Sequence, residues 1–223
     1  MKVLIFGATG MVGQGVLREC LAATDVERVL TVGRTATGVE DKKLGELTIA
    51  DLFHLENVEG QLAGFDACFF CLGVSSAGMK EDAYARLTYN LTLSVAERLA
   101  RLNPEMTFVY VSGAGTDSLE QGRSMWARVK GRTENALLRL PFRAAYMFRP
   151  GLIVPLEGIR SKTRAYRVLY GLIKPFAPLL LRAFPRQVLT TAEVGQAMLA
   201  VTRNGASKAV LETSDLREIV GRR

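Results

Sequence analysis

The stretch KVLIFGATGMVG, residues 2–13, decides the fold of this chain. Its apolar start predicts a buried strand, and the apolar residues from Met11 onward recur at helical spacing. Gly7 permits a tight turn out of the strand, Gly10 lets backbone N–H groups approach a pyrophosphate, and Gly13 lets the helix pack close to the sheet. The spacing is GxxGxxG rather than GxGxxG, so its position between a strand and a helix favours dinucleotide binding more than the glycines alone do. A glycine turn with a purely structural role is the alternative.

Strands and helices alternate along the chain up to about residue 155. Further strands are expected at 28–32, 47–50, 67–72, 107–112 and 143–148, and helices over 82–102 and 123–140. This order predicts an α/β fold, a doubly wound parallel sheet of the Rossmann type with helices on both faces.

We expect a single domain over 1–223, with a core of about 1–155 and a small C-terminal helical cap of about 156–223. Within the cap, helical segments are expected at roughly 160–184 and 191–204, and a short strand at 209–213. The cap would lie over the carboxyl edge of the sheet, where ligands bind in such folds.

The composition is that of a soluble globular protein, with 223 residues, 48% hydrophobic and 23% charged. No uncharged apolar run reaches the roughly 18–20 residues that a membrane span requires, and no signal-peptide pattern follows Met1. The three cysteines are too few for a disulfide framework, and His54 is the only histidine, which excludes a histidine-based metal centre. We therefore expect a cytoplasmic protein without a metal, with peripheral contact to a membrane as an option.

The formal net charge of +7 comes entirely from the C-terminal third of the chain, because residues 149–223 carry 13 Lys and Arg against 5 Asp and Glu. The stretch 158–192 contains seven basic residues and no acidic one. Such a patch attracts an anionic partner, namely a phosphorylated substrate, an anionic membrane surface or nucleic acid, and a protein partner is a further candidate. Nucleic acid is not favoured, since the chain has no helix-turn-helix, zinc-finger or RNP signature. A solvated basic helix face is the alternative.

The end of the second strand bears on the choice of dinucleotide. An NAD site usually has Asp or Glu there to accept from the ribose 2′-hydroxyl, whereas this chain has Gly33-Arg34-Thr35. Because the guanidinium of Arg34 suits a 2′-phosphate, we predict NADP (NADPH) as the cofactor. An exposed arginine without a ligand is the alternative. Asp51, just past the third strand, is a weak candidate contact for the adenine amino group. The candidate contacts in the glycine loop itself are Gly7, Thr9, Gly10, Met11, Val12 and Gly13.

Four further motifs follow the glycine loop: Cys71-Leu-Gly73-Val-Ser75-Ser76, Val111-Ser112, Val129-Lys130-Gly131 and Phe148-Arg-Pro-Gly151. In this order they resemble the short-chain dehydrogenase/reductases, and more narrowly the atypical branch with the Tat-interacting oxidoreductase-like proteins and small bacterial NAD(P)-binding "epimerase" proteins. The resemblance covers roughly residues 1–155 in detail. It implies the fold and nucleotide binding, and it says much less about the reaction.

The resemblance also implies roles for individual residues. Ser112 matches the serine that polarises the substrate carbonyl, and Lys130 matches the lysine that holds the nicotinamide ribose. The loop with Leu72, Gly73 and Ser75 would border the adenosine and its ribose. Pro150 and Gly151 would lie beside the nicotinamide carboxamide.

The chain departs from the family pattern at the proton donor. Four residues before Lys130 the family has a tyrosine, whereas this chain has Trp126, whose indole N–H is a donor only and does not titrate near neutral pH. Tyr166, or Tyr170 folded back over the cleft, is a candidate to donate the proton from a different direction. Tyr170 and Lys174 match the YxxxK spacing, which we interpret as chance.

Two functions remain open from the sequence. The first is an NADP-dependent oxidoreductase that acts on a small carbonyl or alcohol with a non-standard proton donor. The second is an NADPH-binding protein that no longer turns over and binds a protein or membrane partner through its basic cap. By analogy with the superfamily, the two helices at 82–102 and 123–140 are a candidate homodimer face.

Overall fold

The computed structural model describes residues 1–155 and 187–221. Seven strands form one parallel sheet in the order β3-β2-β1-β4-β5-β6-β9. They are β1 (Lys2–Phe6), β2 (Arg28–Gly33), β3 (Leu44–Thr48), β4 (Ala67–Phe70), β5 (Thr107–Val111), β6 (Ala144–Arg149) and β9 (Val210–Glu212). Two short strands, β7 (Leu152–Val154) and β8 (Val188–Thr190), pair in parallel beside this sheet. The predicted doubly wound α/β fold is thereby confirmed.

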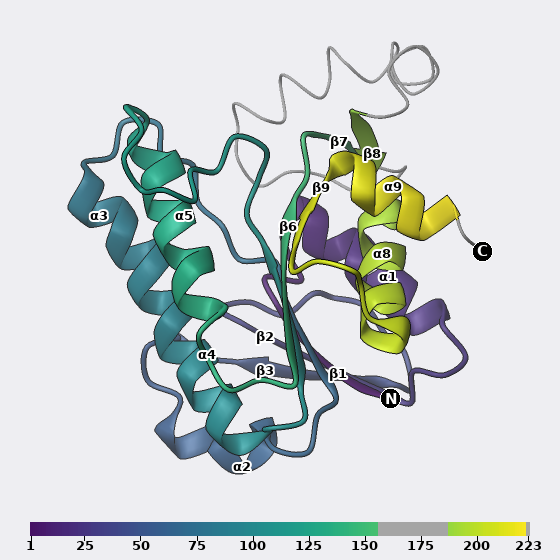
Figure 1. Ribbon diagram of the computed structural model, residues 1–223. Helices are drawn as coiled ribbons and strands as arrows, with labels where there is room; N and C mark the ends of the chain where they lie inside the picture. The colour runs from purple at the N-terminus through teal and green to yellow at the C-terminus, as the bar shows by residue number, and fades with distance from the viewer. Residues whose placement is uncertain (156–186, 222–223) are drawn as a thin grey trace.

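Helices cover both faces of the sheet (Figure 1). One layer consists of α1 (Met11–Ala22), α8 (Thr191–Asn204) and α9 (Thr213–Gly221). The other contains α3 (Glu81–Ala85), the π-helical segment η2 (Arg86–Asn90), α4 (Leu91–Leu102) and α5 (Met125–Leu137). Between β3 and β4 the chain forms η1 (Glu56–Val58) and α2 (Glu59–Leu62). Within the described residues, no helix combines the length and the apolar character that crossing a bilayer requires.

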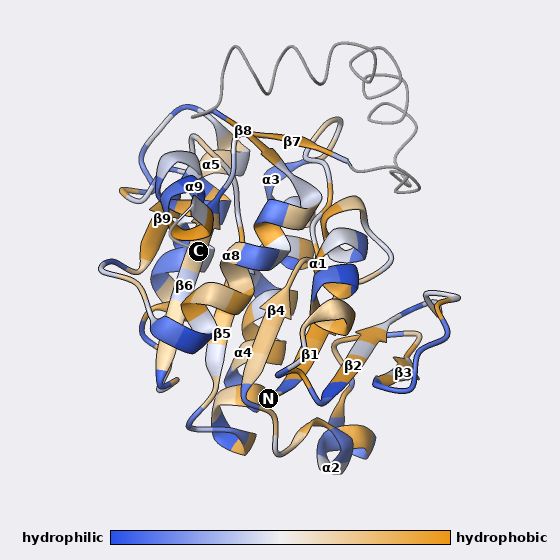
Figure 2. Cartoon of the chain, turned by 90° about the vertical axis from the view of Figure 1, so that its right-hand side faces the viewer, coloured by the Kyte–Doolittle hydropathy of each residue, from blue (hydrophilic) through white to orange (hydrophobic). Residues whose placement is uncertain are grey.

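The residues of the central strands are mostly apolar, as the hydrophobic colour of β1 and β4 in Figure 2 shows. In β1, Val3 and Ile5 belong to the core beneath α1 and α8, whereas Leu4 and Phe6 belong to the core beneath α4. Successive side chains of a strand point to opposite faces, so a strand buried on both faces has a continuous apolar run rather than an alternating one.

Residues 187–221 differ from the cap that the sequence predicts for 156–223. The helix expected at 191–204 is present as α8, but it packs beside α1 on a face of the sheet, and β9 pairs with β6 as the seventh strand. Gly15 of α1 makes this packing close, because a Cβ there would lie 2.5 Å from the Cβ of Thr191. The remaining cap positions 156–186, which include the basic cluster, Tyr166 and Tyr170, lie outside the described residues.

Other boundaries also differ from the sequence-based expectations. The third strand is Leu44–Thr48 rather than 47–50, because it is an edge strand whose residues are half-buried or exposed and lack a continuous apolar pattern. The helix expected over 82–102 begins at Glu81 and contains the π-helical segment η2. The strands β7 and β8 and the helix α9 were not expected from the sequence.

Candidate functional site

The glycine loop between β1 and α1 is a tightly packed backbone cradle. Gly7 has φ +81°, and a Cβ on it would lie 2.7 Å from the backbone nitrogen of Leu72. A Cβ on Gly13 would lie only 2.1 Å from the carbonyl oxygen of Gly7. The N–H of Gly10 donates to that same carbonyl oxygen at 2.9 Å. Only glycine fits at 7 and 13, as the sequence analysis expects, because any side chain would occupy backbone space.

The N-terminus of α1 opens this cradle toward solvent. Gly10 is its N-cap, and among the described residues no side chain caps the helix and no acidic residue lies in its first turn. Thr9, Met11 and Val12 are half-buried around it. Uncapped N–H groups at the positive end of a 12-residue helix suit a phosphate group.

A cavity of about 330 Å³ extends from the glycine loop over the ends of β2 and β3. Its lining consists of three segments and two single residues, namely 7–9, 31–37, 46–48, Leu52 and Leu72. Arg34 is exposed at the cavity, and its guanidinium forms no ion pair within residues 1–155 and 187–221. The cavity therefore offers a cation to a bound anion beside the glycine cradle.

Glu46 also lines the cavity, and sequence reasoning missed it. Its Oε1 accepts from the backbone N–H of Thr37 at 2.7 Å and from the Thr37 hydroxyl. These contacts hold the loop that carries Arg34 against β3. Because the third strand was expected at 47–50, Glu46 fell outside the predicted sheet. No sequence signal therefore indicated that it lines the cavity.

Three predicted adenosine contacts do not line this cavity. The carboxylate of Asp51 accepts from the N–H of Phe53 at 3.0 Å within its own turn. Gly73 and Ser75 lie on the exposed loop after β4, where Ser75 Oγ accepts from the N–H of Ala77 at 3.3 Å. Their roles therefore stay predictions.

Ser112, Lys130 and Pro150 are brought together at the carboxyl edge of the sheet. Lys130 Nζ donates to the carbonyl oxygen of Ser112, directly after β5. The position of a Cβ on Gly113 would be 4.0 Å both from Lys130 Nζ and from the Pro150 carbonyl oxygen. Burial lowers the pKa of Lys130 to about 8, and the nearby Glu134 carboxylate partly opposes that shift.

Trp126 lies on the same face of α5 as Lys130, one turn earlier. Its ring borders the loop after β5, since a Cβ on Gly115 would lie 3.5 Å from Trp126 Cη2. The indole is half-buried. It therefore fills the place of the family's tyrosine beside Lys130.

Pro150 and Gly151 connect the site to the C-terminal elements. The Pro150 carbonyl oxygen accepts from the N–H of Ala114 at 2.9 Å. The N–H of Gly151 donates to Thr213 Oγ1 at 2.8 Å, and a Cβ on Gly151 would lie 3.1 Å from the carbonyl oxygen of Gln187. Gly151 thus has a packing role in addition to its predicted one.

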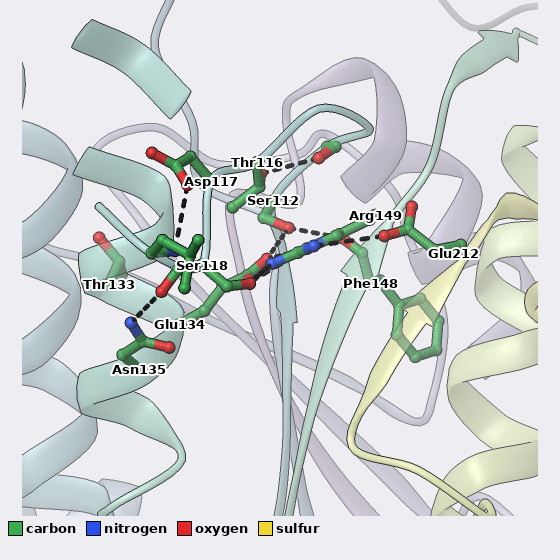
Figure 3. A network of polar contacts seen from close by, with 12 residues as sticks. Ser112, Thr116, Asp117, Ser118, Thr133, Glu134, Asn135, Phe148, Arg149 and Glu212 are labelled. Atoms are coloured by element: carbon green, nitrogen blue, oxygen red, sulfur yellow. Dashed lines mark hydrogen bonds and ion pairs between the residues drawn. The ribbon is translucent and has the colours of Figure 1, made fainter. Parts of the chain in front are cut away.

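A buried ion-pair network lies behind Ser112, and the sequence analysis did not identify it (Figure 3). The hydroxyl of Ser112 contacts the Glu134 carboxylate and, at 3.0 Å, the carbonyl oxygen of Phe148. Arg149 Nε lies 3.1 Å from each oxygen of Glu134, and its Nη1 lies 3.3 Å from Glu212. Glu134 is one turn after Lys130, a spacing that in sequence looks like any exposed i, i+4 pair.

Comparison with known proteins shows the family of this chain. The sequence profile of the NAD dependent epimerase/dehydratase family matches residues 3–120. The chain belongs to that family. The resemblance drawn from the motifs is confirmed, because relatives of the atypical short-chain dehydrogenase/reductase type also match.

Two of these relatives cover much of the chain. Protein HTATIP2 of Rattus norvegicus is 27% identical over 155 residues, 69% of this chain and 63% of that protein. Protein FMP52-2, mitochondrial, of Scheffersomyces stipitis is 26% identical over 210 residues, 92% of this chain and 87% of that protein. The alignment with HTATIP2 thus spans less than two thirds of its length.

Solved structures share the fold. The Bordetella bronchiseptica enzyme WbmF in complex with NAD+ has a TM-score of 0.70 at 14% identity, over 99% of this chain and 76% of that chain. MoeE5 in complex with UDP-glucose and NAD has a TM-score of 0.70 at 19% identity, over 95% and 75%. Both of those structures contain NAD, and the likeness shows that this chain has the same fold.

The comparisons correct the expected location. The fungal FMP52 relatives are named as mitochondrial proteins, and this contradicts the cytoplasmic location expected from the sequence. That expectation rested on the lack of a recognisable targeting pattern, which does not define a compartment.

Proposed function

We propose that this protein binds NADPH in the glycine cradle and the adjoining cavity, and that it is an oxidoreductase for a small carbonyl or alcohol. The observation that carries the proposal is the cradle at Gly7 and Gly13, where a Cβ would collide with backbone, opening onto the cavity that Arg34 borders. The bare helix N-terminus suits the pyrophosphate, and the cavity of about 330 Å³ lies where the adenosine would follow.

Arg34 supports NADPH over NADH. Its exposed guanidinium is a planar fork that binds a phosphate through two parallel hydrogen bonds. Glu46 is the acidic side chain of the cavity, and Thr37 already donates to it twice. A 2′-phosphate would therefore meet the exposed guanidinium of Arg34 and a carboxylate that is already hydrogen-bonded to Thr37.

Lys130 supports proton transfer at this site. In this class of reaction a reduced nicotinamide supplies the hydride to the carbonyl carbon. The ammonium of Lys130 has three N–H donors, and one of them is used on the Ser112 carbonyl. With a pKa of about 8, Lys130 holds a proton at neutral pH and can release it to a carbonyl oxygen. We propose that it takes over the task of the missing tyrosine.

A second candidate function is NADPH binding without turnover. Trp126 at the tyrosine position and the engagement of the Ser112 hydroxyl by Glu134 favour it. NADPH would then stabilise or switch a protein that binds an acidic protein or an anionic membrane through the basic stretch 158–192, of which 158–186 lie outside the described residues.

The first test uses Trp126, the single tryptophan of the chain, as a reporter. Because Trp126 lies beside Lys130 and the loop after β5, bound NADPH should quench the indole and receive its excitation energy. We expect half-saturation at a roughly 10- to 100-fold lower concentration of NADPH than of NADH, from the added charge-assisted hydrogen bonds. A Trp126→Phe variant controls for direct excitation of the nucleotide. No response to either nucleotide would overturn the proposal.

A second prediction concerns the proton donor. Trp126→Tyr places a phenol one turn before Lys130, whose ammonium lowers the pKa of a neighbouring phenol. We expect NADPH oxidation with a panel of small aldehydes and ketones to rise by about 100-fold over the parent. The rate is followed by the loss of the absorbance of reduced nicotinamide, with Trp126→Phe as the control. Equal rates in the two variants would contradict an arrangement for carbonyl reduction. Activity in Trp126→Tyr alone would support the second candidate function.

A further inference from the structure

The hydroxyl of Ser112 is bound within the interior of the protein. Its hydroxyl has one proton and touches two acceptors, the Glu134 carboxylate and the Phe148 carbonyl. The Phe148 carbonyl already accepts the backbone N–H of Ser112 at 2.8 Å. A hydrogen bond to a charged carboxylate is stronger than one to a neutral carbonyl oxygen. The hydroxyl proton of Ser112 therefore goes to Glu134.

In the interior, the carboxylate of Glu134 is paired with the guanidinium of Arg149. The side chain of Glu134 is 1% exposed and that of Arg149 is 10% exposed. Arg149 donates to both carboxylate oxygens and also to Ser118 and Glu212. A buried ion pair persists only when its remaining donors and acceptors are satisfied, and here they are.

Lys130 rests on the backbone that this network fixes. Its ammonium donates to the carbonyl oxygen of Ser112, whose own hydroxyl is held by Glu134. Glu134 and Lys130 lie on successive turns of one face of α5, so the carboxylate holds Ser112 by its hydroxyl and the ammonium contacts its carbonyl oxygen.

We infer that Glu134 is a positioning residue: its carboxylate, balanced by Arg149, holds Ser112 so that the serine hydroxyl is unavailable to a substrate and Lys130 is the proton-bearing group at this edge of the sheet. This inference deepens the proposed function and rests on it for the role of Lys130. It changes the role that the family resemblance gives to Ser112.

Among the described residues, the charged and titratable groups that face Glu134 come from three elements. Lys130 is on α5 itself, Arg149 is on β6, and Tyr110 is on β5. Burial, and to a smaller extent Tyr84 and Glu134, raises the pKa of Tyr110, which stays neutral. Glu134 is the neighbouring charge that raises the pKa of Lys130. Removing the carboxylate in an intact site should therefore lower the pKa of Lys130 further.

The test measures the pKa of Lys130 directly, without nucleotide. The pH dependence of its acetylation by acetic anhydride is followed by peptide mass spectrometry, with the exposed Lys42 as the internal reference. Acetylation needs the neutral amine, so its midpoint reports the pKa. We expect a midpoint near 8 in the parent and a midpoint lower by about one pH unit in Glu134→Gln. The midpoint in Glu134→Asp, which keeps the charge, should stay closer to that of the parent. The midpoint in the exposed control Glu97→Gln should equal that of the parent.

The direction in which the Lys130 midpoint moves distinguishes a positioning role of Glu134 from a role in supporting the fold alone. If Glu134 only holds the structure together, Glu134→Gln admits water and the midpoint of Lys130 moves up toward the ordinary lysine value. That result, or an unchanged midpoint, overturns the inference. If Glu134→Gln does not fold, Glu134→Gln with Arg149→Met leaves no unpaired charge and is expected to lower the midpoint in the same direction. Failure of the NADPH titration would overturn the proposed function and leave this measurement intact.

Discussion

Replacement of Gly13 by alanine is expected to lower the free energy of unfolding by about 3 kcal/mol and to weaken NADPH binding by roughly 100-fold or more. The new Cβ would lie 2.1 Å from the carbonyl oxygen and 2.7 Å from the carbonyl carbon of Gly7, and 2.8 Å from the Cα of Ala8. These are backbone atoms, so no side-chain rotation relieves the collision. The helix α1 must move away from the loop, and its N–H groups then leave the position that suits a pyrophosphate.

Two other glycines provide matched controls for Gly13→Ala. A Cβ on Gly10 would be 3.2 Å from the Gly7 carbonyl oxygen, which a small local shift accommodates, and a Cβ on Gly60 would meet nothing within 4 Å. Gly60→Ala in α2 should therefore be neutral or slightly stabilising. Urea unfolding followed by circular dichroism gives the stability, and the indole titration gives the affinity. If Gly13→Ala resembled Gly10→Ala in both, the loop would not be the rigid cradle described above.

The order of elements up to residue 155 could be predicted because each central strand is a short apolar run that ends near a glycine or a proline. The edge strand Leu44–Thr48 could not, since an edge strand needs burial on neither face to pair with β2. The helix at 191–204 was predicted in position, yet its sequence does not say whether it packs against α1 or over the sheet edge. That choice depends on Gly15 and Gly195, where the two helices approach closely.

In the candidate site, too, some residues can be identified from sequence motifs, whereas others are recognised only from contacts between distant parts of the chain. The family resemblance implied roles for Ser112, Lys130 and Pro150; the structure places the three near one another, and their roles stay predictions. The pairing of Glu134 with Arg149 joins α5 to β6, and a charge looks the same in sequence whether it is buried or solvated. A signal was present, because Arg149 is part of the motif Phe148-Arg-Pro-Gly151 and Glu134 shares the face of Lys130.

The preference for NADPH should reverse when the charge of residue 34 is reversed. Arg34→Glu removes a guanidinium that forms no ion pair within the described part of the chain, so the substitution breaks no structural contact there. It also puts a carboxylate at the end of β2, the place from which a carboxylate accepts the ribose 2′-hydroxyl of NADH. We expect NADPH binding to weaken by about 100- to 1,000-fold and NADH binding to change by less than about threefold.

The matched control for this reversal is Arg139→Glu. Arg139 is an exposed residue after α5, it does not line the cavity, and its reversal lowers the net charge of +7 by the same two charges. If NADPH binding depended only on the general attraction of an anionic nucleotide to a basic protein, both variants would bind NADPH more weakly by the same factor. Added salt would then reduce that difference from the parent. If Arg34 contacts the 2′-phosphate specifically, only Arg34→Glu loses the preference for NADPH over NADH. Equal NADPH affinity in Arg34→Glu and the parent would remove Arg34 from the site and with it the assignment of NADPH, while NADH binding in the glycine cradle would still stand.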